Sequence, residues 1–303
     1  MMKELYSNGK LLLTAEYAIL DGAKGLALPT KFGQSLKLET SNSKALLWKS
    51  LDYNGTIWFS AQFSKIDIKT IHTSDADISQ RLAQILLKAK QLNPAFLSRK
   101  TDYNSIEARL NFPRDWGLGT SSTLITNIAQ WANVNPYQLL AATFGGSGYD
   151  IACAQHNTPI LYQRNEYTPT VSEVPFHPNF SDQLYFVYLN QKKNSREAIN
   201  SYRNLDFDKT ALISKIDTIT DKILTCLDLK EFAALLNKHE AIISETLKIP
   251  TIKDILFSDY SGTIKSLGAW GGDFVLVTGT ASEMNYFKDK GYSIILPYKE
   301  MIL

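Results

Sequence analysis

The sequence predicts an α+β protein of two domains. Its 303 residues suffice for two domains of medium size. Patterns typical of strands and of helices are mixed along the whole chain, with no internal repeat. A stretch rich in turn residues, YTPTVSEVPFHPNFSD, follows residue 165. We therefore expect one domain over residues 1–165 and a second over residues 166–303.

Four elements are expected in the first half. Residues 11–20 are typical of an apolar strand that runs into a helix or turn, and residues 106–112 alternate with the period of a half-buried strand. Asp77 is expected to cap a helix. The apolar face of that helix comprises Leu82, Ile85, Leu86 and Ala89. Asn135 followed by Pro136 predicts another helix start, because proline suits the first helical position.

Helices and strands also alternate in the second half. Strands are expected at residues 184–189, 274–277 and 292–296. Residues 209–226 carry apolar side chains at helical spacing. Asp228, with Glu231 three residues later, resembles a capping box and predicts a helix that ends near Thr246. These elements suit a small two-layer α+β domain.

Composition argues against several classes of protein. Hydrophobic residues make up 44% of the chain and charged residues 20%, which is ordinary globular usage. The formal net charge of +2 favours neither a nucleic-acid partner nor a membrane partner. Cys153 and Cys226 fit buried thiols in a reducing compartment better than a zinc site. No apolar run approaches a membrane span, and Glu16 interrupts the apolar stretch near the N-terminus, so we expect a cytoplasmic protein.

The segment WGLGTSSTLI, residues 116–125, is suited to bind phosphate groups. Gly117 and Gly119 allow the backbone to approach a ligand closely, and a helical apolar pattern follows them. A helix N-terminus offers unpaired amide donors and the positive end of the helix dipole. Taken alone, the segment is equally compatible with an ordinary helix that a serine or threonine caps after a turn.

Two further segments combine glycines with an apolar element. GGSGYDIACA, residues 145–154, brings Asp150 to the start of an apolar segment, where its carboxylate could orient or deprotonate an acceptor group. The same pattern is typical of a turn or cap. KSLGAWGGDFVLV, residues 265–277, places three glycines before an apolar strand, which is also compatible with a tight turn or bulge.

The segment SNGKLLLTAEYAIL, residues 7–20, places two charged residues in apolar surroundings. Lys10 begins an apolar strand, and Glu16 interrupts the apolar run. Because a buried carboxylate requires a partner, we expect an ion pair between Lys10 and Glu16.

Together, these four segments resemble the GHMP kinases, the family of galactokinase, homoserine kinase, mevalonate kinase and phosphomevalonate kinase. SNGKLLLTAEYAILDGAKGLALPT is similar to the first motif of the family, and WGLGTSS to its phosphate loop, GLGSSA. GSGYDIACA resembles the segment of the catalytic aspartate, and KSLGAWGGD the third, glycine-rich motif. Within the family, three segments look most like those of phosphomevalonate kinases. KLLLTAEYAIL is similar to their KLLLTGEYAVL, GSGYDIACA to their GSGFDVAAA, and GAWGGD to their GAGGGD. The resemblance covers essentially the whole chain.

The resemblance implies both a fold and a reaction. The N-terminal domain would resemble domain 2 of ribosomal protein S5 and bind ATP, and the C-terminal domain would be ferredoxin-like. The reaction would transfer the γ-phosphoryl group of ATP, with Mg²⁺, to a small-molecule acceptor, a mevalonate-type acid or its phosphate. The protein would be a monomer or a homodimer.

The resemblance also assigns roles to residues. Asp150 falls on the catalytic aspartate, Lys10 on the catalytic lysine, and Glu16 on the carboxylate that accompanies this lysine on the substrate side. The triphosphate loop corresponds to Gly117, Leu118, Gly119, Thr120, Ser121 and Ser122, of which Ser121 falls on a magnesium ligand. The third motif corresponds to Gly268, Ala269, Trp270, Gly271 and Gly272. Lys192, Ser195 and Arg196 resemble an acceptor-side loop, or are solvated loop residues.

Three departures from the family pattern keep other functions open. Ala15 replaces a glycine before Glu16, and Trp270 replaces a glycine of the third motif. Residues 116–149 contain no Asp or Glu, although relatives have a magnesium-binding Glu there. The alternatives are a mevalonate kinase or other small-alcohol kinase, and a nucleotide- or metabolite-binding protein of this fold that has lost catalysis. Trp270 is expected either to narrow the acceptor pocket or to pack between the domains.

Overall fold

The computed structural model describes residues 2–98, 103–165, 168–191, 195–268 and 270–303, without the side chains of Ser195 and Arg196. These residues form two compact units. The first unit comes from the ranges Met1–Gly9, Phe32–Arg114 and Leu118–Gln155, and the second from Lys10–Lys31, Asp115–Gly117 and His156–Leu303. The segments of the two units interleave along the chain, and the division at residue 165 stays a prediction.

A large mixed sheet is the basis of the first unit. Its strands are β3 (Ala45–Leu51), β4 (Ile57–Ser64), β5 (Thr70–Thr73) and β6 (Ser105–Leu110), with the long strands β1 (Met2–Leu12) and β2 (Gly25–Glu39). The order β5-β4-β3-β6-β2 is antiparallel except for the parallel pair β3 and β6. Strand β1 pairs with β2, and both strands continue into the second unit.

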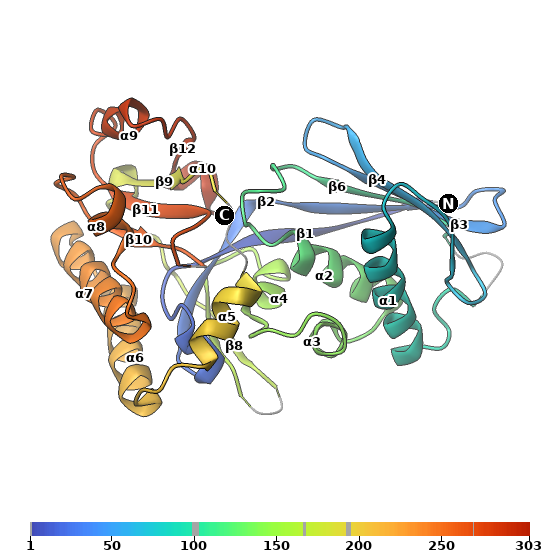
Figure 1. Cartoon of the computed structure of the whole chain (residues 1–303), viewed down its shortest axis with the longest axis horizontal. Helices are drawn as coiled ribbons and strands as arrows, with labels where there is room; N and C mark the ends of the chain where they lie inside the picture. The colour runs from blue at the N-terminus through green and yellow to red at the C-terminus, as the bar shows by residue number, and fades with distance from the viewer. Residues whose placement is uncertain (1, 99–102, 166–167, 192–194, 269) are drawn as a thin grey trace. The chain divides into compact units, whose positions relative to one another are not determined.

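Helices α1, α2 and α3 cover one face of this sheet (Figure 1). The helices of the first unit are α1 (Ala76–Leu92), α2 (Thr120–Ala132), α3 (Pro136–Ala141) and α4 (Tyr149–Ala154). Apolar side chains from the sheet, such as Trp48 and Ile106, pack with Leu86 of α1 and Ile125 of α2 in one buried core. This core fixes the position of α2, whose first turn carries the glycine-rich segment.

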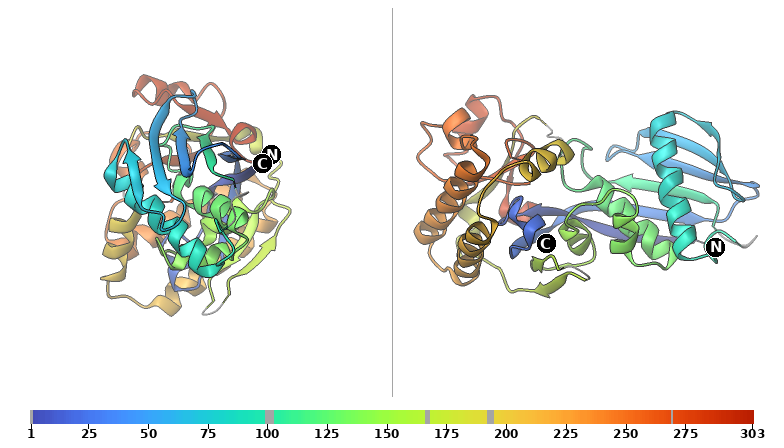
Figure 2. Two further views of the ribbon diagram at one scale, coloured as in Figure 1. Left: turned by 90° about the vertical axis from the view of Figure 1, so that its right-hand side faces the viewer. Right: turned by 60° about the horizontal axis from the view of Figure 1, so that its bottom comes forward.

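The second unit has a smaller, antiparallel sheet in the order β10-β11-β9-β12. Its strands are β9 (Leu184–Tyr188), β10 (Ile264–Ser266), β11 (Phe274–Thr278) and β12 (Ile295–Pro297), with a hairpin of β7 (Ile160–Gln163) and β8 (Thr170–Glu173) that joins β2. Its helices are α5 (Ser195–Arg203), α6 (Lys209–Thr225), α7 (Leu229–Leu247), α8 (Ile252–Leu256), α9 (Asn285–Asp289) and α10 (Tyr298–Met301), with short 3₁₀ helices at Ala18–Asp21 and Ser181–Gln183. Helices α6 and α7 lie side by side, and α7 contacts β10 (Figure 2).

Most local predictions are confirmed, and one cap is wrong. Asn135 caps α3 through the Tyr137 amide, and Asp228 caps α7 by accepting from the Glu231 amide at 2.8 Å. Helix α1 begins two residues earlier than predicted, because Asp75, not Asp77, is the cap and accepts from the amide of Ile78. Asp75 is the better cap because its backbone is extended, as the capping position requires.

The mixed α+β architecture is therefore confirmed. None of the helices in the described part of the chain is long and apolar enough to cross a membrane. Cys153 and Cys226 are buried free thiols.

Candidate functional site

The first turn of α2 presents the glycine-rich segment in the first unit. Gly119, just before the helix, has the left-handed backbone φ of 96° that glycine tolerates, and no side chain caps the helix. The hydroxyl of Ser122 donates to the Gly119 carbonyl at 2.8 Å, whereas Ser121 is exposed. Leu118 is buried in the unit. The exposed hydroxyl and the first amides of α2 are therefore placed to bind an anion from solvent.

Asp150 lies in the first turn of α4, which packs against α2 in the same unit. Gly148, with a left-handed φ of 89°, precedes α4. The Asp150 carboxylate is half-buried and accepts from the amide of Ile151 at 3.0 Å. Upstream, Gly145 and Gly146 have positive φ angles and open space where a side chain would lie. The first unit thus combines an anion-binding helix terminus with a carboxylate on the adjacent helix.

Lys10 lies on the part of β1 that belongs to the second unit. Its half-buried ammonium donates to the carbonyl of Gly117 at 2.9 Å. A side chain at Gly117 would collide with the carboxylate of Asp273, so glycine is required at this position for a packing reason. Asp273 itself has a left-handed φ of 56° and is buried just before β11. Lys10, Gly117 and Asp273 are thus close together within this unit.

The third motif forms the loop between β10 and β11. The Trp270 side chain is 7% exposed, and its indole N–H donates to the Pro250 carbonyl at 3.1 Å. Its backbone N–H donates to the Tyr17 hydroxyl at 2.9 Å. The carbonyl of Gly271 accepts from the side-chain amide of Gln191. Gly268 has open space where a side chain would lie. The indole therefore packs inside the second unit, and its role in an acceptor pocket stays a prediction.

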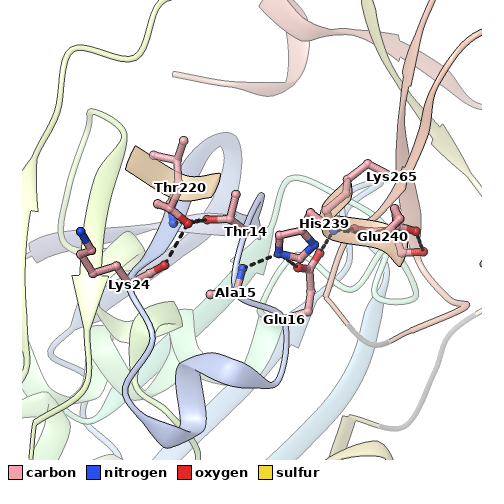
Figure 3. A network of polar contacts seen from close by, with 10 residues as sticks. Thr14, Ala15, Glu16, Lys24, Thr220, His239, Glu240 and Lys265 are labelled. Atoms are coloured by element: carbon pink, nitrogen blue, oxygen red, sulfur yellow. Dashed lines mark hydrogen bonds and ion pairs between the residues drawn. The ribbon is translucent and has the colours of Figure 1, made fainter. Parts of the chain in front are cut away.

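Glu16 lies in a buried polar cluster of the second unit (Figure 3). One carboxylate oxygen, Oε1, accepts from the ammonium of Lys265, and the other, Oε2, lies 3.3 Å from Nε2 of His239. Lys265 also lies 3.1 Å from Oε1 of Glu240. The predicted ion pair between Lys10 and Glu16 is therefore wrong, because Lys265 occupies the position of the cation. Only the fold reveals this pairing, since 249 residues separate the partners.

Burial dominates the titration of this cluster. It raises the pKa of Glu16 to about 7, helped by the charge of Glu240 and opposed by that of Lys265. Burial, and then the charge of Lys265, holds the pKa of His239 well below its ordinary 6.5. Burial opposes the charge of Lys265, but the two glutamates outweigh it and raise the pKa of this lysine. His239 is therefore neutral near pH 7, and Lys265 is charged.

Solved structures share this architecture. The Methanococcus jannaschii mevalonate kinase is 15% identical with a TM-score of 0.69, covering 97% of this chain and 96% of that chain. The Lactococcus lactis galactokinase complexed with galactose is 12% identical with a TM-score of 0.67, covering 95% and 88%. The Streptococcus pneumoniae phosphomevalonate kinase in complex with phosphomevalonate and AMPPNP is 13% identical with a TM-score of 0.63, covering 95% of each chain. No protein-family model matches the sequence, and no curated protein matches it.

The chain has the GHMP kinase fold. Within this fold, the predicted phosphate-loop residues after Gly117 and the predicted catalytic Asp150 belong to the first unit. Lys10, Glu16, Gly117 and the third motif belong to the second unit. Lys192 and Ala269 lie outside the described residues, as do the side chains of Ser195 and Arg196. The binding and catalytic roles of all these residues stay predictions.

Three residues of the buried cluster were missed by the sequence interpretation. Lys265 is the central residue of the short, buried strand β10, while His239 and Glu240 lie on the buried face of α7 beside Leu236 and Ile243. Charged residues at core positions of the amphipathic helix α7 were the available signal. Among the described residues, no group of three or more His, Cys, Asp and Glu side chains is placed to hold a metal ion.

Proposed function

We propose that this protein is an ATP-dependent small-molecule kinase that transfers the γ-phosphoryl group of ATP to an isoprenoid-pathway acceptor. The observation that carries this proposal is the first turn of α2, with its uncapped amides, exposed Ser121 and glycine at position 119. Asp150 on the adjacent helix α4 supplies a carboxylate in the same unit. The GHMP kinase fold supports the proposal, since the neighbours described above include three small-molecule kinases.

The residues divide the work of phosphoryl transfer, in which catalysis is mainly positioning and charge stabilisation. The amides at residues 118–122 bind the phosphates of ATP. Lys10 offsets negative charge on the transferring group. Asp150 orients or deprotonates the acceptor hydroxyl. Gly268 and the rest of the third motif shape the substrate side, and Glu16 supports the first motif from the buried cluster.

Magnesium fits this arrangement with few protein ligands. When bound, Mg²⁺ neutralises charge on the phosphate oxygens. It often keeps several waters and takes one or two protein ligands beside the nucleotide. The exposed hydroxyl of Ser121 would supply one ligand. Because residues 116–149 contain no carboxylate, we expect a weak magnesium requirement that saturates well above the level of a two-ligand site.

The acceptor we favour is a mevalonate-type acid or its phosphate. The motifs KLLLTAEYAIL, GSGYDIACA and GAWGGD support the phosphate, because they resemble those of phosphomevalonate kinases. A mevalonate kinase or other small-alcohol kinase is the alternative within this class. We also propose a cytoplasmic monomer or homodimer without a nucleic-acid or membrane partner, from the modest net charge.

Calorimetric titration with Mg-ATP and an ADP-release assay over several acceptors test the proposal. We expect ATP to bind, Gly119→Leu to abolish binding, and ADP release to occur with mevalonate or phosphomevalonate. The matched control is Gly145→Leu, at a second glycine of positive φ in the first unit, which should retain ATP binding. Failure of both ATP and ADP to bind at millimolar concentration would contradict the kinase function.

A nucleotide- or metabolite-binding protein without catalysis is the second candidate. The absence of a carboxylate over residues 116–149 favours it. A magnesium titration separates the two functions. ATP affinity and ADP release that both rise with Mg²⁺ support the kinase, whereas ATP affinity indifferent to Mg²⁺, with no turnover on any acceptor, supports the binding protein.

A further inference from the structure

The buried cluster of Glu16, His239, Glu240 and Lys265 joins three segments of the second unit. Glu16 lies between β1 and the first 3₁₀ helix, His239 and Glu240 lie on α7, and Lys265 lies on β10 (Figure 3). Their side chains are at most 4% exposed. The cluster is therefore sealed from solvent, and its protons and charges must balance internally.

The ammonium of Lys265 donates to Oε1 of Glu16 and, at 2.6 Å, to the carbonyl of Ser266. It also forms an ion pair with Oε1 of Glu240 at 3.1 Å, without a hydrogen bond. Glu240 accepts at Oε2, from the hydroxyl of Ser266 at 3.1 Å. One oxygen of Glu240 thus lies beside a cation and the other beside a donor, which favours the ionised carboxylate.

The second carboxylate oxygen of Glu16, Oε2, lies beside an acceptor instead of a donor. The amide N–H of Ala15 points at Nε2 of His239 at 2.9 Å, so Nε2 is an acceptor and the imidazole proton lies on Nδ1. Oε2 of Glu16 lies 3.3 Å from this same nitrogen. An ionised Oε2, which accepts no hydrogen bond, would face the lone pair of Nε2, whereas a proton on Oε2 would share this lone pair with the amide of Ala15.

Charge balance leads to the same assignment. Two ionised carboxylates and one ammonium would leave a net negative charge in a site without solvent. One proton on Glu16 makes the cluster neutral, with Lys265 charged, Glu240 ionised and His239 uncharged. Burial raises the pKa of Glu16 to about 7 and also raises that of Glu240, as expected of a site in which the two carboxyl groups keep one proton.

We propose that Glu16 is a protonated carboxylic acid that donates to Nε2 of His239, and that this neutral cluster positions the segment from Thr14 to Tyr17 against α7 and β10. The segment needs such support because Ala15 and Tyr17 have positive φ angles of 71° and 58°. Tyr17 in turn accepts from the backbone of Trp270. The cluster thus holds the end of the first motif beside the third motif. This assignment does not depend on the proposed kinase activity.

Infrared titration of the full-length protein tests the protonation state. A buried protonated carboxyl group gives a carbonyl band distinct from that of a carboxylate. We expect this band at about pH 6 and its loss at about pH 9. Glu16→Gln should remove the band, whereas Glu245→Gln, an exposed residue on the same helix as Glu240, should retain it. A wild-type protein without the band at about pH 6 would overturn the proposal.

Thermal unfolding of three variants tests which carboxylate holds the proton. Glu16→Gln imitates the neutral acid, because its amide donates to His239 and its carbonyl accepts from Lys265, so its Tm should fall by only a few degrees. Glu240→Gln should lower Tm more, because Glu16 must then ionise against the lone pair of His239. The double variant leaves Lys265 without a counterion and should lose more than the sum of the two single shifts, or fail to fold. A Glu16→Gln variant less stable than Glu240→Gln, or additive Tm shifts, would overturn the assignment.

Discussion

The first turn of α2 and the buried cluster around Lys265 use polar residues in opposite ways. At α2, Ser121 is exposed and the helix has no side-chain cap, so donors remain for a ligand. In the cluster, the ammonium of Lys265 is fully buried, donates to Glu16 and the Ser266 carbonyl, and forms an ion pair with Glu240. The first region consists of neighbours in sequence, and the second joins residues up to 249 positions apart.

This difference separates two roles for motif residues. A motif residue with unused donors on the surface is available to a ligand, whereas one whose partners are all buried stabilises the fold. Glu16 and Gly117 both belong to motifs that the resemblance assigns to substrate or nucleotide. The contacts of Glu16 and Gly117 in this structure are structural, and substitutions can distinguish stability from function at each position.

The largest expected effect is on turnover at Asp150. Asp150→Asn removes a group that orients or deprotonates the acceptor, so ADP release should fall by ~10²–10⁴-fold. ATP affinity and Tm should change little, because asparagine has nearly the same size and keeps an oxygen that can accept from the amide of Ile151. Single-turnover ADP release and calorimetry measure the two effects. Wild-type turnover in this variant would exclude Asp150 from catalysis.

Lys265→Met should be the most destabilising single change in the cluster. It leaves Glu16 and Glu240 buried without a cation, which costs about 3–5 kcal/mol of unfolding free energy. Denaturant unfolding measures the loss. The matched control is Lys238→Met on the exposed face of α7, which should stay within about 0.5 kcal/mol of wild type. Equal losses at the two positions would show that the cluster contributes nothing to stability.

Gly117→Ala should destabilise the protein more than Gly145→Ala does. Both glycines have positive φ angles, 68° and 66°, so each alanine costs about 1–2 kcal/mol of backbone strain. At Gly117 the new methyl group also collides with Asp273, which adds about 1–3 kcal/mol, whereas Gly145 has open space. Chemical denaturation of both variants checks the difference. Identical losses would mean that Asp273 moves aside without cost.

Glu16 and His239 should give stability opposite dependences on pH. The pKa of Glu16 rises from 4.5 to about 7 on folding, so the folded state keeps a proton and stability falls as pH rises through this window. The pKa of His239 falls on folding, so its contribution is present above about 6.5 and is lost as pH drops below this value. Glu16→Gln should remove the first slope and His239→Gln the second.

Unfolding free energies measured from about pH 4.5 to about pH 8 test these signs. The wild-type protein, both variants and Glu245→Gln are compared at each pH. If the two substitutions change the slope in the same direction, at least one of the assigned protonation states is wrong.

The smallest expected effects distinguish Ser121 from Ser122. Ser122→Ala removes a buried hydroxyl that donates to the Gly119 carbonyl, so the unfolding free energy should fall by about 1 kcal/mol. Ser121→Ala should leave stability unchanged, because the residue is exposed, but it should weaken the magnesium dependence of ATP binding. Thermal unfolding and calorimetry at several magnesium concentrations measure both effects. A loss of stability in Ser121→Ala but not in Ser122→Ala would contradict the stabilising role of Ser122 and the ligand-binding role of Ser121.

The sequence by itself determined the local elements and the architecture. The alternation at Ile106, Ala108 and Leu110 predicted β6, and Asn135 and Asp228 predicted two helix starts, because periodicity and capping depend on residues a few positions apart. The order of the four glycine or charge motifs predicted the GHMP kinase fold. The glycines before α2 also predicted where that helix begins.

Only the tertiary structure decided which charges meet. From the sequence, Lys10 was the nearest cation for Glu16, but the fold places Lys265 there and directs Lys10 to the Gly117 carbonyl. A pattern of apolar residues shows that a position is buried, because burial follows local periodicity. It does not show which buried partner satisfies a charge, because the partner comes from another segment that only the folded chain brings into contact.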